Sequence, residues 1–229
     1  MKVLGRFQAA SEHYSAKVFS TWLNSDGREA ASTTYEEVWD RAGAVAHLLR
    51  VKLKICKGDR VMLCFGFGLD FFIAMLGCFR AGVVAVPVYP PNPAKMDSSL
   101  RKLALISKDC GARMCLADKE VMTLRRLQLV NPFKASKWPK GLKWESMVPA
   151  GSKASKCFDE VSLDDGDIAF LQYTSGSTGQ PKGVMVTFAN LEHNLAVVMS
   201  RAISHVRTRV GVSWLPQYHD MGLVVGLMM

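Results

Sequence analysis

The chain has 229 residues, of which 49% are hydrophobic and 21% charged, so it is long enough for one large globular domain or two small ones. It contains no uninterrupted apolar run of about 18 residues, which argues against a membrane span, and residues 1–8 lack the apolar core of a signal peptide. We therefore expect a cytoplasmic protein. The net charge of +9 requires a nucleic-acid partner to be considered.

The six cysteines do not suggest a metal site. None forms a C-x-x-C pair, and no Cys/His spacing matches a zinc site. Cys64 and Cys78 lie within apolar runs, where a free thiol behaves as a small hydrophobic side chain. We expect mostly buried free thiols in a reducing compartment, and we assign no metal ligands.

The N-terminal part of the chain predicts a strand followed by a helix. Residues 17–23 alternate well enough for a strand, and Asn24–Gly27 has the composition of a turn. Thr34 followed by Glu37 forms a capping-box pattern. The apolar spacing that follows predicts a helix to about residue 49.

Two apolar runs, 61–65 and 83–88, flank a nearly all-apolar helix at 70–80. Strand, helix and strand within about thirty residues, with both strands apolar throughout, predict a parallel βαβ unit. A second strand–helix repeat follows, with a helix at 98–109, a strand at 114–117 and a helix at 120–129. The predicted fold class is α/β, with mostly parallel strands flanked by helices. Such sheets bind ligands at the carboxyl ends of their strands.

A lysine-rich segment, residues 134–156, contributes much of the positive charge. Trp138 and Trp144 interrupt it, and basic residues interleaved with aromatic residues can bind single-stranded nucleic acid. The simpler interpretation is a solvated, irregular loop whose tryptophans hold it against the body of the protein. We favour the loop, and predict no nucleic-acid partner, because nothing else in the chain is typical of a nucleic-acid-binding module.

A run of hydroxyl, glycine and lysine residues follows the apolar stretch 168–171, which predicts a buried strand. Glycines let backbone N–H groups approach an anion, hydroxyls add donors and a lysine adds positive charge. This mixture, stiffened by Pro181, favours a phosphate-binding loop over a flexible polar connection between two strands. The residues assigned to phosphate are Thr174, Ser175, Gly176, Ser177, Thr178, Gly179 and Lys182.

A second polar and aromatic cluster follows a predicted helix at 187–205 and a predicted strand at 210–215. The imidazole of His219 can contact a carboxylate or phosphate, and the neighbouring aromatic rings can line an apolar substrate. The alternative is structural: Asp220 caps the next helix and His219 packs beside it. Spacing alone does not decide between these interpretations. The candidate site residues of this cluster are Trp214, Tyr218, His219 and Asp220.

Residues 174–183 match every fixed position of the signature [ST]-S-G-[ST]-T-G-x-P-K-G, and so resemble the phosphate loop of adenylate-forming enzymes. That family includes acyl-CoA synthetases, luciferases, the adenylation domains of peptide synthetases and fatty acyl-AMP ligases. Residues 213–223 and the proline-rich stretch 86–93 are similar to fatty acyl-AMP ligases in particular. One departure is Phe188, where many relatives carry histidine, and we expect little effect on phosphate binding.

The resemblance implies that ATP and a fatty acid react to give an acyl-adenylate and pyrophosphate, with Mg²⁺ sharing the phosphate charge. It implies that His219 lies near the reacting carboxylate and the α-phosphate, with the acyl-binding tunnel close by. The acyl group would then pass to the thiol of an acyl carrier protein or, in an acyl-CoA ligase, to coenzyme A. A non-catalytic adenylate-binding or regulatory module is the alternative from outside the enzymes.

The resemblance extends from about Phe7 to the end of the chain. Residues 1–229 are therefore expected to be an incomplete N-terminal adenylation domain that ends inside a buried helix. In the family, a C-terminal lid carries the catalytic lysine, and an insertion distinguishes acyl-AMP ligases from CoA ligases; both would lie beyond Met229. We expect the chain to be inactive by itself, and the complete protein to be an enzyme.

Overall fold

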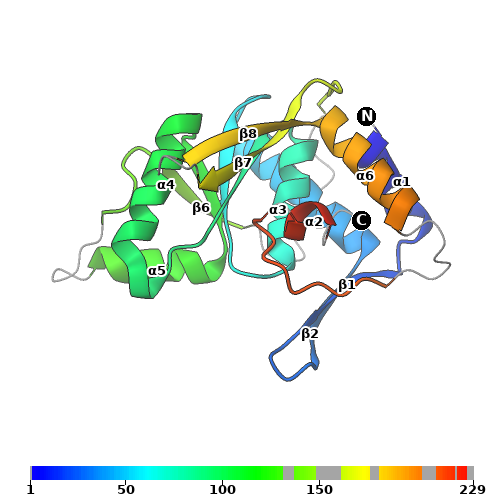
Figure 1. Ribbon diagram of the computed structural model, residues 1–229, viewed down its shortest axis with the longest axis horizontal. Coiled ribbons are helices and arrows are strands. Elements are labelled where there is room, and N and C mark those ends of the chain that lie inside the picture. Colours follow the sequence, from blue (N-terminus) through cyan, green and yellow to red (C-terminus); the bar gives the residue numbers. More distant parts are fainter. Residues whose placement is uncertain are drawn as a thin grey trace.

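Six strands form the central sheet, in the order β6-β5-β3-β4-β7-β8. The last two, β7 and β8, lie side by side in Figure 1. The computed structural model describes residues 2–130, 137–147, 161–175, 181–202, 210–219 and 221–225. Neighbouring strands are parallel, except that β8 runs antiparallel to β7. This confirms the predicted α/β fold with a mostly parallel sheet. The strands are β3 (Arg60–Cys64), β4 (Val84–Val88), β5 (Met114–Ala117), β6 (Lys143–Ser146), β7 (Ile168–Ser175) and β8 (Pro181–Thr187).

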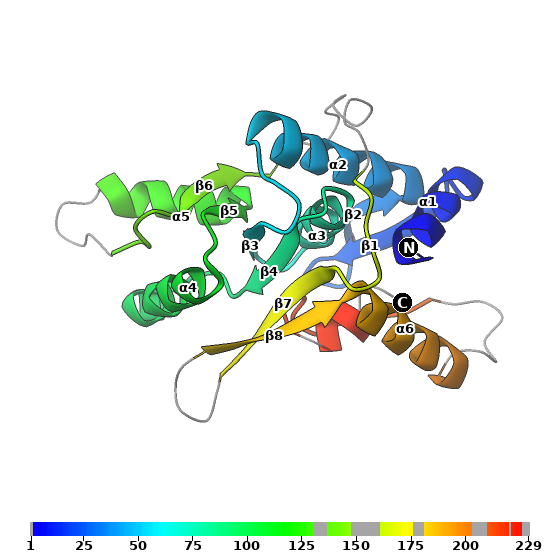
Figure 2. The same cartoon turned by 90° about the horizontal axis from the view of Figure 1, so that it is seen from above.

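Helices cover both faces of this sheet (Figure 2). On β3, Val61 and Leu63 belong to one hydrophobic core, whereas Met62 and Cys64 belong to the other. A strand that is apolar on both faces needs a helical layer against each of them. The first core is covered by α1 (Lys2–His13), α2 (Tyr35–His47), α3 (Leu69–Arg80) and α6 (Phe188–Ala202), and the second by α4 (Met96–Cys110) and α5 (Lys119–Val130).

The predicted turn and capping box are confirmed at the start of the fold. The side-chain oxygen of Asn24 accepts hydrogen bonds from the backbone N–H groups of Asp26 and Arg28, at 3.0 and 2.9 Å. At the start of α2, the Thr34 hydroxyl accepts from the Glu37 N–H at 3.2 Å, and the Glu37 carboxylate accepts from the Thr34 N–H at 2.8 Å. The bond from the Thr34 backbone lowers the pKa of Glu37, because it stabilises the charged form.

Two elements of the N-terminal part, up to residue 34, were not predicted from the sequence. One is β2 (Glu29–Thr34), which pairs antiparallel with β1 (Val18–Leu23) in a hairpin that projects from the body of the molecule (Figure 1). Most of β2 is solvent-exposed, so it carries no apolar alternation that would reveal it. The other is α1, whose Val3, Leu4 and Phe7 pack against the first core with helical spacing.

In the described part of the lysine-rich segment, residues 137–147, the tryptophans hold the chain against the body of the protein, as the loop interpretation predicts. Trp138 is buried, and its ring meets the Trp144 ring edge to face, with the centroids 5.0 Å apart. The Arg125 guanidinium faces both rings. The segment is not wholly irregular, however, because β6 pairs with β5 and so becomes an edge strand of the sheet. Its short, charged sequence contains too little alternation to show this pairing.

The predicted strand at 210–215 is wrong. Residues 210–214 form neither helix nor strand in the structure, and Val210, Val212 and Trp214 are 86%, 79% and 81% exposed. A strand needs a neighbour that pairs with its backbone, and the described strands provide none for this stretch. The apolar residues of this stretch were therefore not sufficient evidence for a strand. Further on, Met221–Val225 form one π-helical turn.

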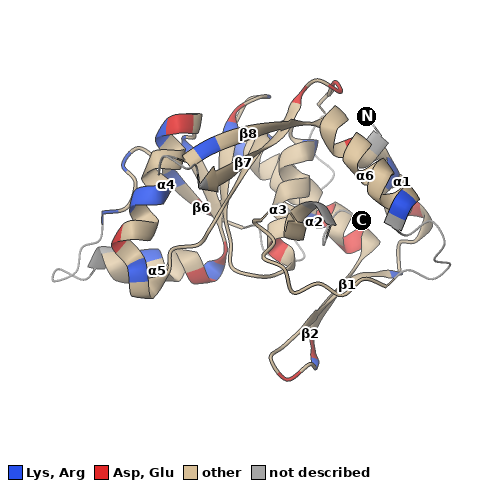
Figure 3. Ribbon diagram, viewed as in Figure 1, with Lys and Arg blue, Asp and Glu red and all other residues tan. Residues whose placement is uncertain are grey.

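The thiols and charges are distributed as expected for a folded domain. Cys64, Cys78, Cys110 and Cys115 are free and buried, and burial raises the pKa of the last three thiols. Cys56 is exposed, in contrast. Several Lys and Arg positions are marked in blue along the ribbons of α4 and α5 in Figure 3. Within the described part of the chain, no helix is long and apolar enough to cross a membrane.

Candidate functional site

The carboxyl ends of β3, β4 and β7 lie side by side, because these parallel strands are neighbours in the sheet. The segment after β3 contains Gly68, the residue after β4 is Tyr89, and β7 ends within the predicted phosphate-binding run. Segments that lie far apart in the sequence are thereby gathered at one edge of the sheet, where open α/β sheets bind their ligands.

Much of the phosphate-binding run lies in strands rather than in a loop. β7 continues to Ser175 and β8 starts at Pro181, which pairs with it. Thr174 pairs with Lys182 in the same antiparallel ladder. The predicted Gly176, Ser177, Thr178 and Gly179, which stand between these two strands in the sequence, lie outside the described residues.

Thr174 and Lys182 lie on one face of the β7–β8 hairpin. Side chains alternate between faces along a strand, and directly opposite residues of an antiparallel pair share a face. Gln172 is on that same face, and its amide nitrogen donates to the Tyr218 carbonyl at 3.2 Å. The exposed side chains of Thr174 and Lys182 thus project on the side of the sheet that carries Tyr218 and His219.

The segment 216–219 is folded into a tight turn. The His219 N–H donates to the Pro216 carbonyl at 3.0 Å, and the His219 carbonyl accepts from the Leu223 N–H at 2.8 Å. The Tyr218 ring lies against the Tyr89 ring, with the centroids 4.3 Å apart. Burial and then Tyr89 raise the pKa of Tyr218, so its hydroxyl stays protonated at neutral pH.

The remaining residues of the second cluster differ in their surroundings. The Trp214 side chain is 81% exposed and does not share the packing of Tyr218. His219 is exposed at the carboxyl edge, whereas Asp220 lies outside the described residues, so its predicted capping and substrate contacts stay predictions. The structure therefore brings Tyr218 and His219 toward the hairpin, and leaves Trp214 on the surface.

Gln217 is a residue that sequence reasoning missed. It is only 4% exposed, and its side-chain oxygen accepts a hydrogen bond from the Gly68 N–H at 2.8 Å. This contact ties the 216–219 turn to the segment after β3. The signal in the sequence is a polar residue that stands between the aromatic candidates Trp214 and Tyr218. If such a residue is buried, its side-chain amide needs hydrogen-bond partners.

Two glycines near the site are required by close packing. A Cβ atom on Gly222 would lie 2.1 Å from the Pro216 carbonyl oxygen, which belongs to rigid backbone. A Cβ atom on Gly183 would lie 2.9 Å from Cζ of Tyr173, its partner across the hairpin. The glycine after Lys182 therefore accommodates a tyrosine ring, and this role differs from the phosphate approach expected of glycines in the signature.

The comparisons with known proteins show the family of the chain. Residues 7–229 match the AMP-binding enzyme family, and the chain belongs to that family. It is 33% identical to the medium-chain-fatty-acid–[acyl-carrier-protein] ligase JamA of Moorena producens, over 96% of this chain and 36% of JamA. It is also 33% identical to the long-chain-fatty-acid–AMP ligase FadD32 of Mycolicibacterium smegmatis, over 75% of this chain and 26% of FadD32.

A solved structure of the Legionella pneumophila fatty acyl-adenylate ligase, in complex with acyl adenylate and pyrophosphate, has the same fold. The TM-score is 0.84 at 32% sequence identity, over 99% of this chain and 37% of that protein. The chain thus spans about a third of the length of these relatives. The resemblance to adenylate-forming enzymes inferred from the sequence is confirmed.

Proposed function

We propose that this chain is the N-terminal part of a fatty acyl-AMP ligase-like enzyme. In the complete enzyme, a fatty acid carboxylate oxygen attacks the α-phosphorus of ATP, and the bond to the leaving pyrophosphate breaks. The observation that carries this proposal is the shared face of Lys182, Thr174 and the His219 turn at the carboxyl edge of the sheet. The carboxylate and the leaving pyrophosphate lie on opposite sides of the α-phosphorus, so a cationic phosphate-binding group and a carboxylate-binding group must face the same ligand-binding region.

The phosphate grip is assigned to the hairpin. Thr174 and Lys182 are exposed on the relevant face, which fits a role in binding the β- and γ-phosphates together with residues 175–179. Mg²⁺, when bound with ATP, would neutralise part of the phosphate charge. Catalysis by these residues consists of positioning and charge stabilisation, because phosphoryl and adenylyl transfer require little covalent chemistry from the protein.

The acid-binding side is assigned to the second cluster. His219 would orient the carboxylate, and Tyr218, held against Tyr89, would form part of the wall for the acyl chain. Trp214 and Asp220 complete the proposed substrate contacts. The exposed Trp214 would be buried only when substrate or another part of the protein covers it. The acyl group would then pass to an acyl-carrier-protein thiol, in a cytoplasmic enzyme.

The test uses the full-length protein. We expect pyrophosphate exchange that depends on ATP and a fatty acid, followed by transfer of the acyl group to a holo-carrier protein. Thioester formation with free coenzyme A instead would favour an acyl-CoA ligase. No exchange with any fatty acid of medium or long chain would contradict the proposal and favour a binding module. The 229-residue chain alone is expected to show no exchange.

The acid-binding role of His219 has its own test. His219→Ala should raise the KM for the fatty acid more than the KM for ATP, because the imidazole is assigned to the carboxylate. His193→Ala is a suitable control, since His193 lies on α6 and has no assigned role. An equal rise of both KM values in His219→Ala would contradict the assignment.

A further inference from the structure

The second face of the β7–β8 hairpin is attached to α4. Tyr173 points to this face, where it packs at the edge of the second core, and its hydroxyl donates a hydrogen bond to the Asp109 carboxylate. Its ring also covers Gly183 on the neighbouring strand. One tyrosine therefore contacts both strands of the hairpin and a helix 64 residues away in the sequence.

The end of α4 that carries Asp109 is itself fixed to the sheet. The Arg60 side chain on β3 donates to the Cys110 carbonyl at 2.6 Å. Gly111 ends the helix in the left-handed conformation, with φ +65°. Asp109 is therefore an acceptor on a rigid support, and a hydrogen bond to it restrains the hairpin.

The position of Asp109 is unfavourable for the helix alone. The carboxyl end of a helix carries partial negative charge, so an aspartate in the last turn of α4 is repelled by the helix dipole. Lys108, next to it, has the favoured sign. A side chain that opposes its local preference indicates a tertiary role, and the bond from Tyr173 supplies one.

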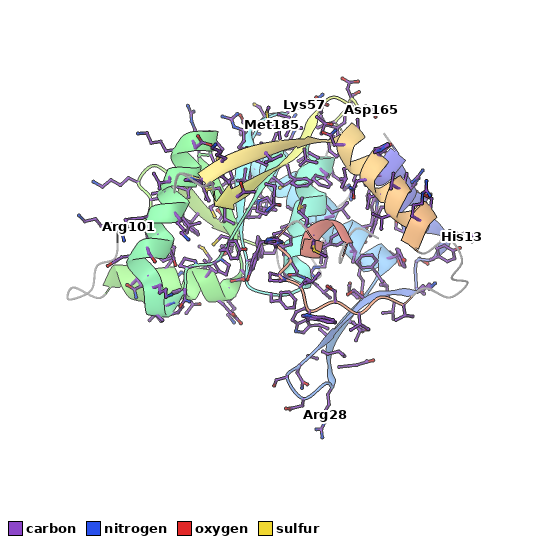
Figure 4. The ribbon with its side chains drawn as sticks, in the orientation of Figure 1. His13, Arg28, Lys57, Arg101, Asp165 and Met185 are labelled. Carbon is purple, nitrogen blue, oxygen red and sulfur yellow. The ribbon has the colours of Figure 1, made fainter. Side chains whose placement is uncertain are left out.

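The hairpin end needs such a restraint. The pairing of β7 with β4 joins Phe170 to Ala85, and Tyr173 lies beyond that pair toward the turn. β8 is an edge strand, with a neighbour on one side only. Met185 on β8 is 66% exposed and projects from the outer side of the hairpin (Figure 4). Backbone pairing to the rest of the sheet therefore ends before Thr174 and Lys182 are reached.

We propose that Tyr173 and Asp109 form a latch that positions the phosphate hairpin for ATP. Tyr173 is adjacent to Thr174, and Gly183 is adjacent to Lys182, so the latch holds both phosphate-binding side chains from the opposite face. These are positioning residues and do not touch the nucleotide. Burial and then the Asp109 bond raise the pKa of Tyr173, which keeps the hydroxyl a donor at neutral pH. The kinetic consequence of the latch, a change in the KM for ATP, rests on the proposed function.

The kinetic test uses pyrophosphate exchange by the full-length enzyme. Tyr173→Phe and Asp109→Ala should each raise the KM for ATP about five- to tenfold, as for loss of one solvent-exposed hydrogen bond, with the KM for fatty acid unchanged. The double variant should be no worse than either single variant, because both remove the same bond. Asp109→Asn keeps a carbonyl acceptor and should stay within about twofold of wild type.

Asp97→Ala is the matched control, because Asp97 is an exposed aspartate at the opposite end of α4. An unchanged KM for ATP in both single variants would overturn the latch, as would equal changes in both KM values or additive effects in the double variant. An Asp109→Asn variant as impaired as Asp109→Ala would also count against it.

A second measurement separates failure of the latch from failure of the proposed function. Hydrogen exchange of the backbone amides of residues 182–187 requires no turnover. It should be about tenfold faster in Tyr173→Phe than in wild type, because local opening of the hairpin becomes easier. Equal exchange rates would overturn the latch. Absence of pyrophosphate exchange in the wild-type enzyme, with faster amide exchange in the variant, would contradict the proposed function and leave the latch supported.

Discussion

The β7–β8 hairpin and the segment 216–225 carry the two halves of the proposed site, and they are held in different ways. The hairpin is paired through its backbone along its length and is attached to α4 by Tyr173. In the described residues of 216–225, no strand pairing occurs, and the position depends on Gln217, on Tyr218 and on the close approach at Gly222. Backbone pairing tolerates changes of side chain, whereas individual side-chain contacts do not.

Because the two segments are held differently, we expect substitutions in them to have different effects on the protein. Substitutions of exposed hairpin side chains such as Lys182 should mainly affect chemistry, because the backbone pairing survives their loss, whereas Tyr173 acts on the position of the hairpin. Substitutions in 216–225 should affect position and stability first, because each contact there is made by a particular residue. The following predictions test that contrast.

The largest effect is expected for Lys182→Ala in the full-length enzyme. Its side chain is exposed on the hairpin, so folding should be unaffected, while kcat/KM for adenylation should fall by about 10²–10³-fold through loss of transition-state charge stabilisation. Pyrophosphate exchange and a thermal melt measure the two quantities. Lys102→Ala, which removes an exposed lysine within α4, is the control and should change neither quantity. Unchanged exchange in Lys182→Ala would refute the phosphate grip.

Gly222→Ala should be the most destabilising change in the second segment. The added methyl would meet the Pro216 carbonyl oxygen at 2.1 Å, and the turn must open to accept it. We expect a loss of about 1–3 kcal/mol in the free energy of unfolding, as for overpacking. Gly211→Ala is a matched control, because no atom lies within 4 Å of the Cβ it would add. Similar melting temperatures for both variants would contradict the close approach.

Gln217→Ala tests the attachment of the turn to the segment after β3. It leaves the half-buried Gly68 N–H without an acceptor, which should lower the free energy of unfolding by about 1 kcal/mol. Adenylation should fall together with stability, since the turn carries His219. Chemical denaturation measures the first effect, and pyrophosphate exchange the second. Gln8→Ala, whose exposed amide bonds to Glu12 on the same helix, should change neither.

The smallest effect is expected at the base of the hairpin, just before β7. Lys57 Nζ lies 2.7 Å from the Asp167 carboxylate. Figure 4 labels Lys57 and, close to it, Asp165, which is two residues before Asp167. The bond to Lys57 and then the Asp164 N–H lower the pKa of Asp167. A carboxyl group with a lowered folded-state pKa stabilises the fold above its unfolded pKa, and this stabilisation is lost as pH falls through the folded value.

Thermal melts of wild type and Asp167→Asn between about pH 6 and pH 2 test this linkage. The variant should melt slightly below wild type near neutrality, and the two curves should converge in acid. Asp165→Asn, two residues earlier, controls for the general loss of charge. A constant difference between wild type and Asp167→Asn across the whole pH range would contradict the ion pair.

Several elements followed correctly from local patterns. The Thr34–Glu37 capping box and the Asn24 turn are made by residues close in sequence, so their chemistry is visible without the fold. The parallel βαβ unit followed from apolar runs of the right length. The predicted strand at 210–215 failed for the corresponding reason: alternation describes a strand's faces, whereas a strand also needs a paired neighbour.

The sequence by itself determined the class of elements, the family and the residue types available to hold phosphate, because caps, periodicity and the signature are local properties. Only the tertiary structure decided which of those residues share a face. The ladder register places Thr174 opposite Lys182, and packing joins Tyr173 to Asp109 and Gln217 to Gly68, 149 residues away. Such pairings depend on strand order and crossover geometry, which no local pattern specifies.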